Sequence, residues 1–379
     1  MHRWLPLFLL LFGCTDPLDD DDSASDDDDS VSDDDDSVSD DDDSAADDDD
    51  ATAPPTWADA GDAWLTITGE GVGAEVAALG DIDGDGAPDI ALGLPDDPWE
   101  DAVPATGFGA VYVFFGETTA APGTIDLSAA DVVIRGDGGG DGIGNNVASA
   151  GDVDGDGAPD LLVSGGATEN TYLFFASTLA LGGELRAADA DAVINELVSE
   201  HIAGVGDVDD DGFGDLLLSN TLISSNGNVA GQSFLIGGAS LTAGSVLSVD
   251  NAWVTYPGEG PGNASGGDIG PVGDLDGDGL ADFAIAATGN SDGGANAGKL
   301  YVFFGASVVA SGGGSVALTT ADVIAVGLAG DDRLGTSIAA LGDVDGDLRD
   351  DFAVGAPRHD LPEADGGGLW IVSGAGLTS

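Results

Sequence analysis

Basic residues are almost absent from this sequence. Its 379 residues include 72 acidic side chains but only 7 lysines and arginines, which gives a formal net charge of -65 at pH 7. A surface this acidic repels phosphate backbones and anionic lipid headgroups. We therefore expect no nucleic-acid partner and no electrostatic attachment to a membrane.

Cysteine, histidine and lysine are also scarce. The chain has one cysteine (Cys14), three histidines and one lysine (Lys299). A single cysteine allows no internal disulfide, so packing and metal have to hold the fold together. Zinc sites and covalent catalysis depend on these same residue types. The composition therefore favours a protein that is not an enzyme.

No apolar run is long enough to cross a bilayer as a permanent helix. The longest one near the N-terminus covers residues 7–12 and follows a single positive charge at Arg3. This combination is typical of a secretory signal. We expect residues 1–13 to be a signal peptide and the protein to be exported.

The end of this segment, Leu-Phe-Gly-Cys at residues 11–14, resembles the bacterial lipobox, in which the signal is cut before a cysteine that takes a lipid. The resemblance implies a lipid on Cys14, which would be the chain's only link to a membrane. Thr15, in place of an inner-membrane Asp signal, implies an outer-membrane lipoprotein that faces the cell surface or the periplasm. An ordinary signal with an incidental cysteine is the alternative.

Residues 14–56 form a separate segment of very low complexity. Four-aspartate blocks recur every seven residues from Asp19 to Asp50, separated by Ser, Ala and Val. A coiled coil would need large apolar residues at two positions of each heptad, and adjacent like charges repel. We interpret the segment as a disordered tether. A low-affinity calcium reservoir or a ligand for a basic partner is the alternative.

The remaining residues, 57–379, contain five copies of one motif. Each copy is an Asp-rich loop that runs directly into an apolar segment, as in GDIDGDGAPDIALG from Gly80. The leading aspartates are 71, 55, 67 and 69 residues apart, so the repeating unit has about 65 residues. Such a period indicates a repeat architecture with one supersecondary unit per copy.

Each unit contains four short segments that favour β-strands. One precedes the Asp loop, one follows it, a third is rich in aromatic residues, and a fourth comes before the next unit. Four strands are the size of a propeller blade. The last unit lacks a fourth strand, whereas residues 64–68 form a strand with no unit of their own. We predict an all-β fold, a five-bladed β-propeller whose N-terminal strand completes the last blade.

The repeats resemble the FG-GAP repeats of integrin alpha-subunit propellers. The fifth unit matches best, with Leu-Gly-Thr-Ser at residues 334–337, its loop at Asp343 and Gly-Ala-Pro at residues 355–357. The resemblance covers residues 64–379 and implies a calcium-binding propeller that serves in adhesion. Propellers of this family usually have seven blades, so the count of five departs from the pattern.

The loop pattern DxDGDGxxD suits a hard cation. Side chains at positions 1, 3, 5 and 9 and the carbonyl at position 7 supply only oxygen, and Gly at position 6 allows a sharp turn. Calcium accepts six to eight such oxygens, whereas zinc prefers His or Cys. We predict about four to five calcium ions per chain. The predicted ligands are Asp81, Asp83, Asp85 and Asp89; Asp152, Asp154, Asp156 and Asp160; Asp207, Asp209, Asp211 and Asp215; Asp274, Asp276, Asp278 and Asp282; and Asp343, Asp345, Asp347 and Asp351.

A solvated acidic turn without metal is the alternative for each loop. Four carboxylates within nine residues repel when nothing compensates them, which favours metal. The fifth loop is weaker, because Leu348 stands where the others have Gly. Bound calcium would then contribute to folding.

Two functional classes follow. The first is a surface-tethered, monomeric binding or adhesion module for a protein or glycan ligand. The second is an enzyme that acts on extracellular polysaccharide through acidic residues near Trp99, such as Asp96, Asp97, Glu100 and Asp101. An acidic chain offers such groups by chance, so we favour the binding module. A purely structural envelope protein is a third possibility.

Overall fold

The structure is a computed structural model that describes residues 63–97, 109–138, 142–165, 170–195, 200–224, 226, 228–360 and 366–377. The predicted signal peptide, Cys14 and the Asp-rich tether lie outside the described residues. Everything below concerns the repeat-bearing part of the chain.

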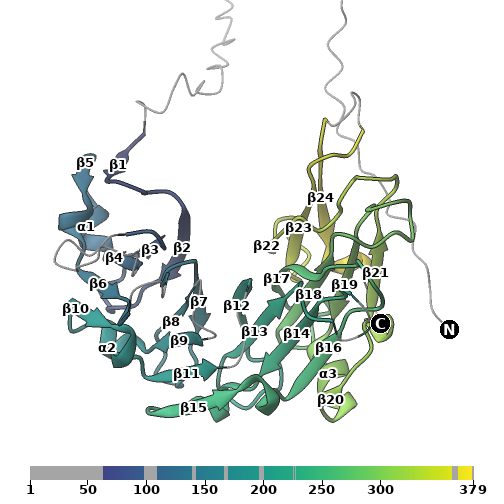
Figure 1. Cartoon of the computed structure of the whole chain (residues 1–379), viewed down its shortest axis with the longest axis horizontal. Helices are drawn as coiled ribbons and strands as arrows, with labels where there is room; N and C mark the ends of the chain where they lie inside the picture. Colours follow the sequence, from purple (N-terminus) through teal and green to yellow (C-terminus); the bar gives the residue numbers. More distant parts are fainter. Residues whose placement is uncertain are drawn as a thin grey trace, which may run out of the picture. The chain divides into compact units, whose positions relative to one another are not determined.

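The fold is all-β and propeller-like, as predicted. The apolar segment after each Asp loop forms a fully or largely buried strand, and the aromatic segment pairs with it. We name the resulting sheets blade 1 to blade 5 in chain order (Figure 1). Their strands are β2 (Glu75–Gly80), β3 (Asp89–Leu94), β4 (Ala110–Phe114) and β6 (Val132–Arg135); β7 (Asn146–Gly151), β8 (Asp160–Ser164), β9 (Asn170–Phe174) and β11 (Ala192–Asn195); β12 (His201–Gly206), β13 (Asp215–Asn220), β14 (Gln232–Ile236) and β16 (Val254–Pro257); β17 (Ser265–Gly273), β18 (Asp282–Ala287), β19 (Lys299–Phe303) and β21 (Val323–Val326); and β22 (Ser337–Gly342), β23 (Asp351–Ala356) and β24 (Gly368–Ser373).

Each blade is an antiparallel meander with a register shift just before its Asp loop. In blade 1 the shift falls between Ala78 and Gly80, and equivalent shifts occur in the other four blades. Gly80 has a φ of 81°, a conformation that glycine adopts without steric cost. The irregular end of the first strand thereby turns the chain out of the sheet and into the loop.

Neighbouring repeats are also linked by a short strand that the sequence did not predict; one repeat adds it to the preceding blade, and we call it the exchanged strand. A short strand after the third strand of one repeat pairs in parallel with the fourth strand of the preceding blade. The connection ties blades 1 and 2, 2 and 3, and 3 and 4 together. The exchanged strands are β10 (Gly183–Arg186), β15 (Ser245–Ser248) and β20 (Gly314–Ser315).

The N-terminal strand β1 (Leu65–Thr68) pairs with a strand that we did not predict. We expected it beside the last blade, but among the described residues it pairs in parallel only with β5 (Gly123–Asp126). This pairing matches the one that each exchanged strand makes with the fourth strand of the preceding blade. Blade 5 therefore has three strands, and closure into a ring is not part of the described structure.

The core lies between successive blades. The first strands contact one another in chain order, and each interface buries the apolar faces of two sheets. Between blades 3 and 4, Tyr256 packs on Phe303 with ring centroids 4.6 Å apart and on Phe283 at 5.8 Å. Apolar packing between blades thus replaces a single central core.

Short helices cap the turns after the third strands. The carboxylates of Asp131, Asp191 and Asp322 accept hydrogen bonds from the backbone N–H groups of the residues that precede the three α-helices. Among the described residues, no helix is long and apolar enough to cross a membrane. The helices are α1 (Gly116–Thr119), α2 (Ala176–Leu179) and α3 (Gly305–Ser311), with 3-10 turns η2 (Leu127–Ala129), η3 (Ala187–Asp189), η4 (Gly238–Ser240), η5 (Val249–Asn251), η6 (Leu318–Thr320) and η7 (Gly374–Gly376).

Candidate metal sites

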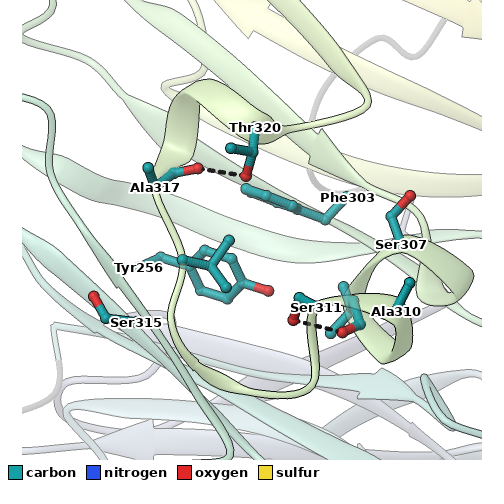
Figure 2. Close-up of a pocket in the computed structure, with 10 residues that line it drawn as sticks. Tyr256, Phe303, Ser307, Ala310, Ser311, Ser315, Ala317 and Thr320 are labelled. Carbon is teal, nitrogen blue, oxygen red and sulfur yellow. Dashed lines mark hydrogen bonds between the residues drawn. The ribbon is translucent and has the colours of Figure 1, made fainter.

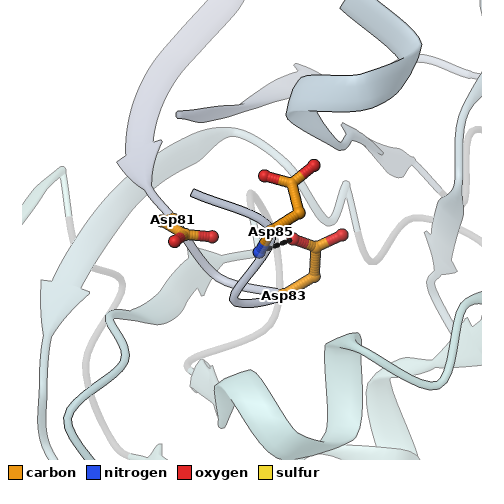
Figure 3. Close-up of side chains that lie close together, drawn as sticks. All are labelled: Asp81, Asp83 and Asp85. Carbon is orange, nitrogen blue, oxygen red and sulfur yellow. Dashed lines mark hydrogen bonds between the residues drawn. The ribbon is translucent and has the colours of Figure 1, made fainter. Parts of the chain in front are cut away.

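Every Asp loop joins the first strand of its blade to the second. In blade 1 the first strand ends at Gly80 and the second begins at Asp89, so the ninth loop position is also the first residue of a strand. Figure 3 shows Asp81, Asp83 and Asp85 on this loop. The same placement recurs in all five blades because the repeats share their spacing.

The first aspartate shapes the loop. The Asp81 carboxylate accepts hydrogen bonds from Gly84 N at 2.8 Å and from Gly86 N at 3.0 Å. The first aspartates of the other loops accept equivalent bonds, except that in blade 3 the first donor is Asp211 N at position 5 in place of position 4. These bonds fold the loop back on itself, so that its side chains converge.

Three carboxylates in each loop lie close enough to share a cation. One oxygen from each residue of a group lies within 4.8 Å of the others. In blades 1 and 5 the group consists of positions 1, 3 and 5, and in blades 2 to 4 it consists of positions 1, 3 and 9. The groups are Asp81, Asp83 and Asp85; Asp152, Asp154 and Asp160; Asp207, Asp209 and Asp215; Asp274, Asp276 and Asp282; and Asp343, Asp345 and Asp347.

The structure therefore brings together three of the four predicted ligands of every loop. The fourth ligand lies outside the group in each case. These outlying residues are Asp89, Asp156, Asp211, Asp278 and Asp351.

One oxygen in these groups is suited to contact a cation. Asp209 Oδ1 is buried and has no hydrogen-bond partner among the described residues. Burial raises the pKa of Asp209, and the neighbouring carboxylates of Asp211 and Asp207 raise it further. A charged oxygen without a partner is costly in a protein interior. A bound cation would remove this cost, so the donor set fits a hard metal ion.

The ninth aspartate also has a structural role that we did not predict from the sequence: it accepts hydrogen bonds from the backbone. Asp160 is fully buried, and its carboxylate accepts hydrogen bonds from Val153 N at 2.9 Å and from Ala176 N at 2.8 Å. The first bond closes the loop, and the second holds the start of α2. The ninth aspartates of the other four blades make the same pair of bonds.

Burial strongly raises the pKa of the ninth aspartate in blades 2, 3 and 4. It raises the pKa of Asp160, Asp215 and Asp282 to about 7. The bonds from backbone N–H groups oppose this shift, and the other loop carboxylates add to it. A cation beside these residues would favour their charged form.

Two loop positions require a left-handed backbone. Position 6 has positive φ in every loop, for example 87° at Gly86 and 72° at Leu348. Leu348 thus adopts a left-handed conformation that its side chain disfavours, as the sequence indicated. Position 4 is left-handed as well, and there Asp210 replaces glycine with a φ of 60°.

Two stretches of the chain match a model of a known repeat. They are residues 266–303 and 334–372, which include the loops of blades 4 and 5. The chain contains two FG-GAP repeats. No curated protein matches the sequence. The other three loops share the hydrogen bonds of the two FG-GAP repeats, although their sequences fall outside the matched residues.

Solved structures give a distant likeness. One is a crystal structure of BBS1N in complex with ARL6DN, soaked with lead, with 11% identity, a TM-score of 0.36, and coverage of 74% of this chain and 76% of that one. Another is the V. cholerae biofilm matrix protein Bap1, with 14% identity and a TM-score of 0.29. That match covers 70% of this chain and 41% of Bap1.

The residues suggested for an enzymatic site are only partly described. Asp97 accepts a hydrogen bond from the Tyr112 hydroxyl at 2.8 Å and forms an ion pair with Arg135 at 3.2 Å. Its carboxylate thus has structural partners. Trp99, Glu100 and Asp101 lie outside the described residues.

Proposed function

We propose that this protein is an exported, lipid-anchored β-propeller that binds calcium in its Asp loops and presents a binding surface to a protein or glycan ligand outside the cell. The observation that carries the proposal is that a cluster of three aspartate carboxylates recurs in the loop of every one of the five blades. The two FG-GAP repeats support a role in binding.

Calcium is the cation that this donor set favours. The groups offer only carboxylate and backbone oxygens, and calcium accepts six to eight oxygen ligands in flexible geometry. Magnesium prefers stricter octahedral geometry and zinc prefers nitrogen or sulfur. Calcium would offset the repulsion among the loop carboxylates and add its binding energy to the stability of the fold.

A binding module is favoured over an enzyme by the chemistry of the chain. Asp96 and Asp97 are the described members of the suggested catalytic group; Asp96 is exposed, and Asp97 has its carboxylate in a hydrogen bond and an ion pair. The sequence offers one lysine and three histidines as further catalytic groups. We propose Cys14 as the lipid anchor, residues 14–56 as the tether, and an outer-membrane location.

We further propose that five blades close into one ring. Residues 63–71 read AWLTITGEG and residues 252–260 read AWVTYPGEG, so β1 has the sequence of a fourth strand. Blade 5 lacks that strand, and β1 has one unpaired edge among the described residues. Five lies within the usual range of four to eight blades.

Metal analysis tests the calcium sites. We expect about four to five calcium ions per purified mature chain, and removal of calcium by a chelator should lower the melting temperature. Deletion of residues 16–56 controls for ions on the tether and should leave the count unchanged. Fewer than about four ions, or a melt that does not respond to the chelator, would contradict the proposal.

A glycan array and a glycosidase screen, performed side by side, test the functional class. Binding without turnover supports a binding module, and turnover would overturn it. Cys14→Ser tests the anchor, since it should move the protein from the membrane fraction to the soluble fraction.

A further inference from the structure

A pocket of about 480 Å³ lies between blades 3 and 4, and its described lining includes no residue of an Asp loop. It is bordered by β16, β19, α3 and residues 315–320 (Figure 2). Its described lining contains no carboxylate and no basic group, although the chain carries a net charge of -65. The pocket therefore suits a neutral ligand better than a charged one.

Tyr256 departs from the repeat at this site. It lies opposite Ser233 in blade 3, and the equivalent positions of blades 1 and 2 hold Ile134 and Ile194. Both isoleucines are fully buried in apolar clusters. Packing at this position thus requires no hydroxyl group, and isoleucine is sufficient in blades 1 and 2.

The Tyr256 hydroxyl is buried without a hydrogen-bond partner among the described residues. Burial raises its pKa, with a further contribution from Asp322, so the group remains a proton donor. Figure 2 shows the hydroxyl directed toward the part of the pocket where Ser311 lies. A buried donor without a partner reduces stability, so its presence calls for an explanation.

Three other hydroxyl groups of the pocket have already used their protons. Ser307 donates to Asp322 Oδ1, Ser311 to Val308 O and Thr320 to Ala317 O, each at 2.7 Å. Their oxygens can still accept hydrogen bonds. The pocket thus combines the buried Tyr256 donor and the exposed Ser315 hydroxyl with several acceptors beside two aromatic rings, Tyr256 and Phe303.

We propose that this pocket binds one ring of a neutral sugar. A sugar hydroxyl would accept the proton of Tyr256, and other hydroxyls would donate to the serine and threonine oxygens at the rim. The volume exceeds that of one sugar ring, and pockets of 300 to 1,000 Å³ are typical of small-ligand sites. The inference rests on the proposed function, since it selects glycans as the ligand class and this pocket as the subsite.

Entry of the sugar needs a small rearrangement. The Tyr256 hydroxyl is covered in the free protein, so the chain near Ser311 has to shift for contact. Three glycines with positive φ, Gly312 to Gly314, follow directly and leave the chain free to adjust. Trp253 packs against Gly313 and can therefore report the shift through its fluorescence.

Titration of the full chain with methyl glycosides of glucose, galactose and mannose tests the inference. We expect saturable binding of at least one glycoside by calorimetry and Trp fluorescence. Tyr256→Phe should weaken it at least tenfold while the melting temperature without sugar stays equal or rises. Tyr112→Phe, which removes a hydroxyl in blade 1, should leave sugar binding unchanged.

Three outcomes would overturn the inference. They are binding of none of the three glycosides, equal binding by wild type and Tyr256→Phe, or equal loss in Tyr112→Phe. If the chain nevertheless holds its calcium and binds a protein or a larger glycan, the proposed function survives and only the pocket is refuted. If calcium content and macromolecular binding also fail, the proposed function fails with it.

Discussion

Leu348 holds a backbone conformation that favours glycine. Its φ is 72°, its side chain is 90% exposed, and the other four loops have glycine at the same position. The side chain therefore contributes little packing to offset the steric cost. The backbone N–H of Leu348 still donates to Asp343 Oδ2 at 2.9 Å, and glycine would keep this bond.

Leu348→Gly should accordingly stabilise the protein by about 1 kcal/mol, since the left-handed conformation costs about 1–2 kcal/mol and glycine adds entropy to the unfolded chain. Urea denaturation measures the change. The reverse substitution at the matched position, Gly86→Leu, should destabilise blade 1. A loss of stability in Leu348→Gly would contradict the argument.

Asp268 is a buried carboxylate outside the Asp loops. Its Oδ2 accepts a hydrogen bond from Ile338 N at 2.7 Å, which connects the first strands of blades 4 and 5. Burial raises the pKa of Asp268 to about 6, and the bonds from backbone N–H groups oppose the shift. His201 lies 3.8 Å away, and burial lowers the pKa of this imidazole.

The sign of the pH effect follows from this shift. The folded state holds the Asp268 proton more tightly than the unfolded state, so this residue's contribution to stability is greatest below about pH 4 and falls as pH rises through 6. Asp268→Asn keeps an acceptor for Ile338 N and cannot ionise. It should be more stable than wild type by about 1–3 kcal/mol at about pH 8, with little difference at about pH 4.

Denaturation at several pH values measures this dependence. Asp331→Asn, at an exposed site, serves as the matched control and should show no such slope. A constant difference between Asp268→Asn and wild type across the pH range would refute the assignment.

At the scale of the elements, the ninth aspartate joins three parts of each blade. Asp282 begins β18, closes its loop through Leu275 N at 2.8 Å and holds α3 through Gly305 N at 2.9 Å. Asp278, at position 5 of the same loop, is exposed by comparison. A comparison of variants at Asp282 and Asp278 therefore distinguishes the structural role of the buried ninth aspartate from the role of an exposed loop carboxylate.

Asp282→Ala should leave two buried N–H groups without partners and destabilise the chelator-treated protein by about 2–4 kcal/mol. Asp278→Ala should cost much less under the same conditions. Urea denaturation in the presence of chelator measures both. Equal effects of the two substitutions would show that the backbone contacts of Asp282 are unimportant.

The strands and the loops were predictable from the sequence because each has a local signal. The apolar segments after the loops became β3, β8, β13, β18 and β23, and the aromatic segments became their partners. The exchanged strands had no such signal. β20 consists of Gly314 and Ser315 alone, and its partner β16 lies in another repeat.

The candidate site was predictable to the same extent. Spacing indicated which carboxylates converge, but it could not show that Asp160 also binds Ala176 N, since that bond spans 16 residues. The Tyr256 pocket was missed for a similar reason. A comparison of the fourth strands, with isoleucine in two repeats and tyrosine in one, would have pointed to it.

At the scale of the whole molecule, the chain has two complementary strand edges. On blade 5, Leu369 and Ile371 are 68% and 62% exposed, whereas their counterparts in blade 4, Leu300 and Val302, are buried. The face that a next blade would cover is thus left open. At the other end, β1 pairs with β5 as a fourth strand does and leaves one edge unpaired among the described residues.

The register of blade 3 predicts how these edges would meet. Leu235 faces Val254 and Ser233 faces Tyr256. Transfer of this register to blade 5 places Ile371 opposite Leu65 and Leu369 opposite Ile67. Both exposed side chains would then gain an apolar partner, on the face that Ile67 already shares with the core of blade 1.

Paired cysteines test this closure in a chain with Cys14→Ser. Ile67→Cys with Leu369→Cys should form a disulfide within one chain, because directly opposite Cβ atoms lie within bonding range. Thr66→Cys with Leu369→Cys should not, since a shift of one residue points the side chains to opposite faces. Electrophoresis without reductant distinguishes the products. Disulfide-linked dimers would show that the edges pair between two copies and would refute closure, as would equal cross-linking of the two variants.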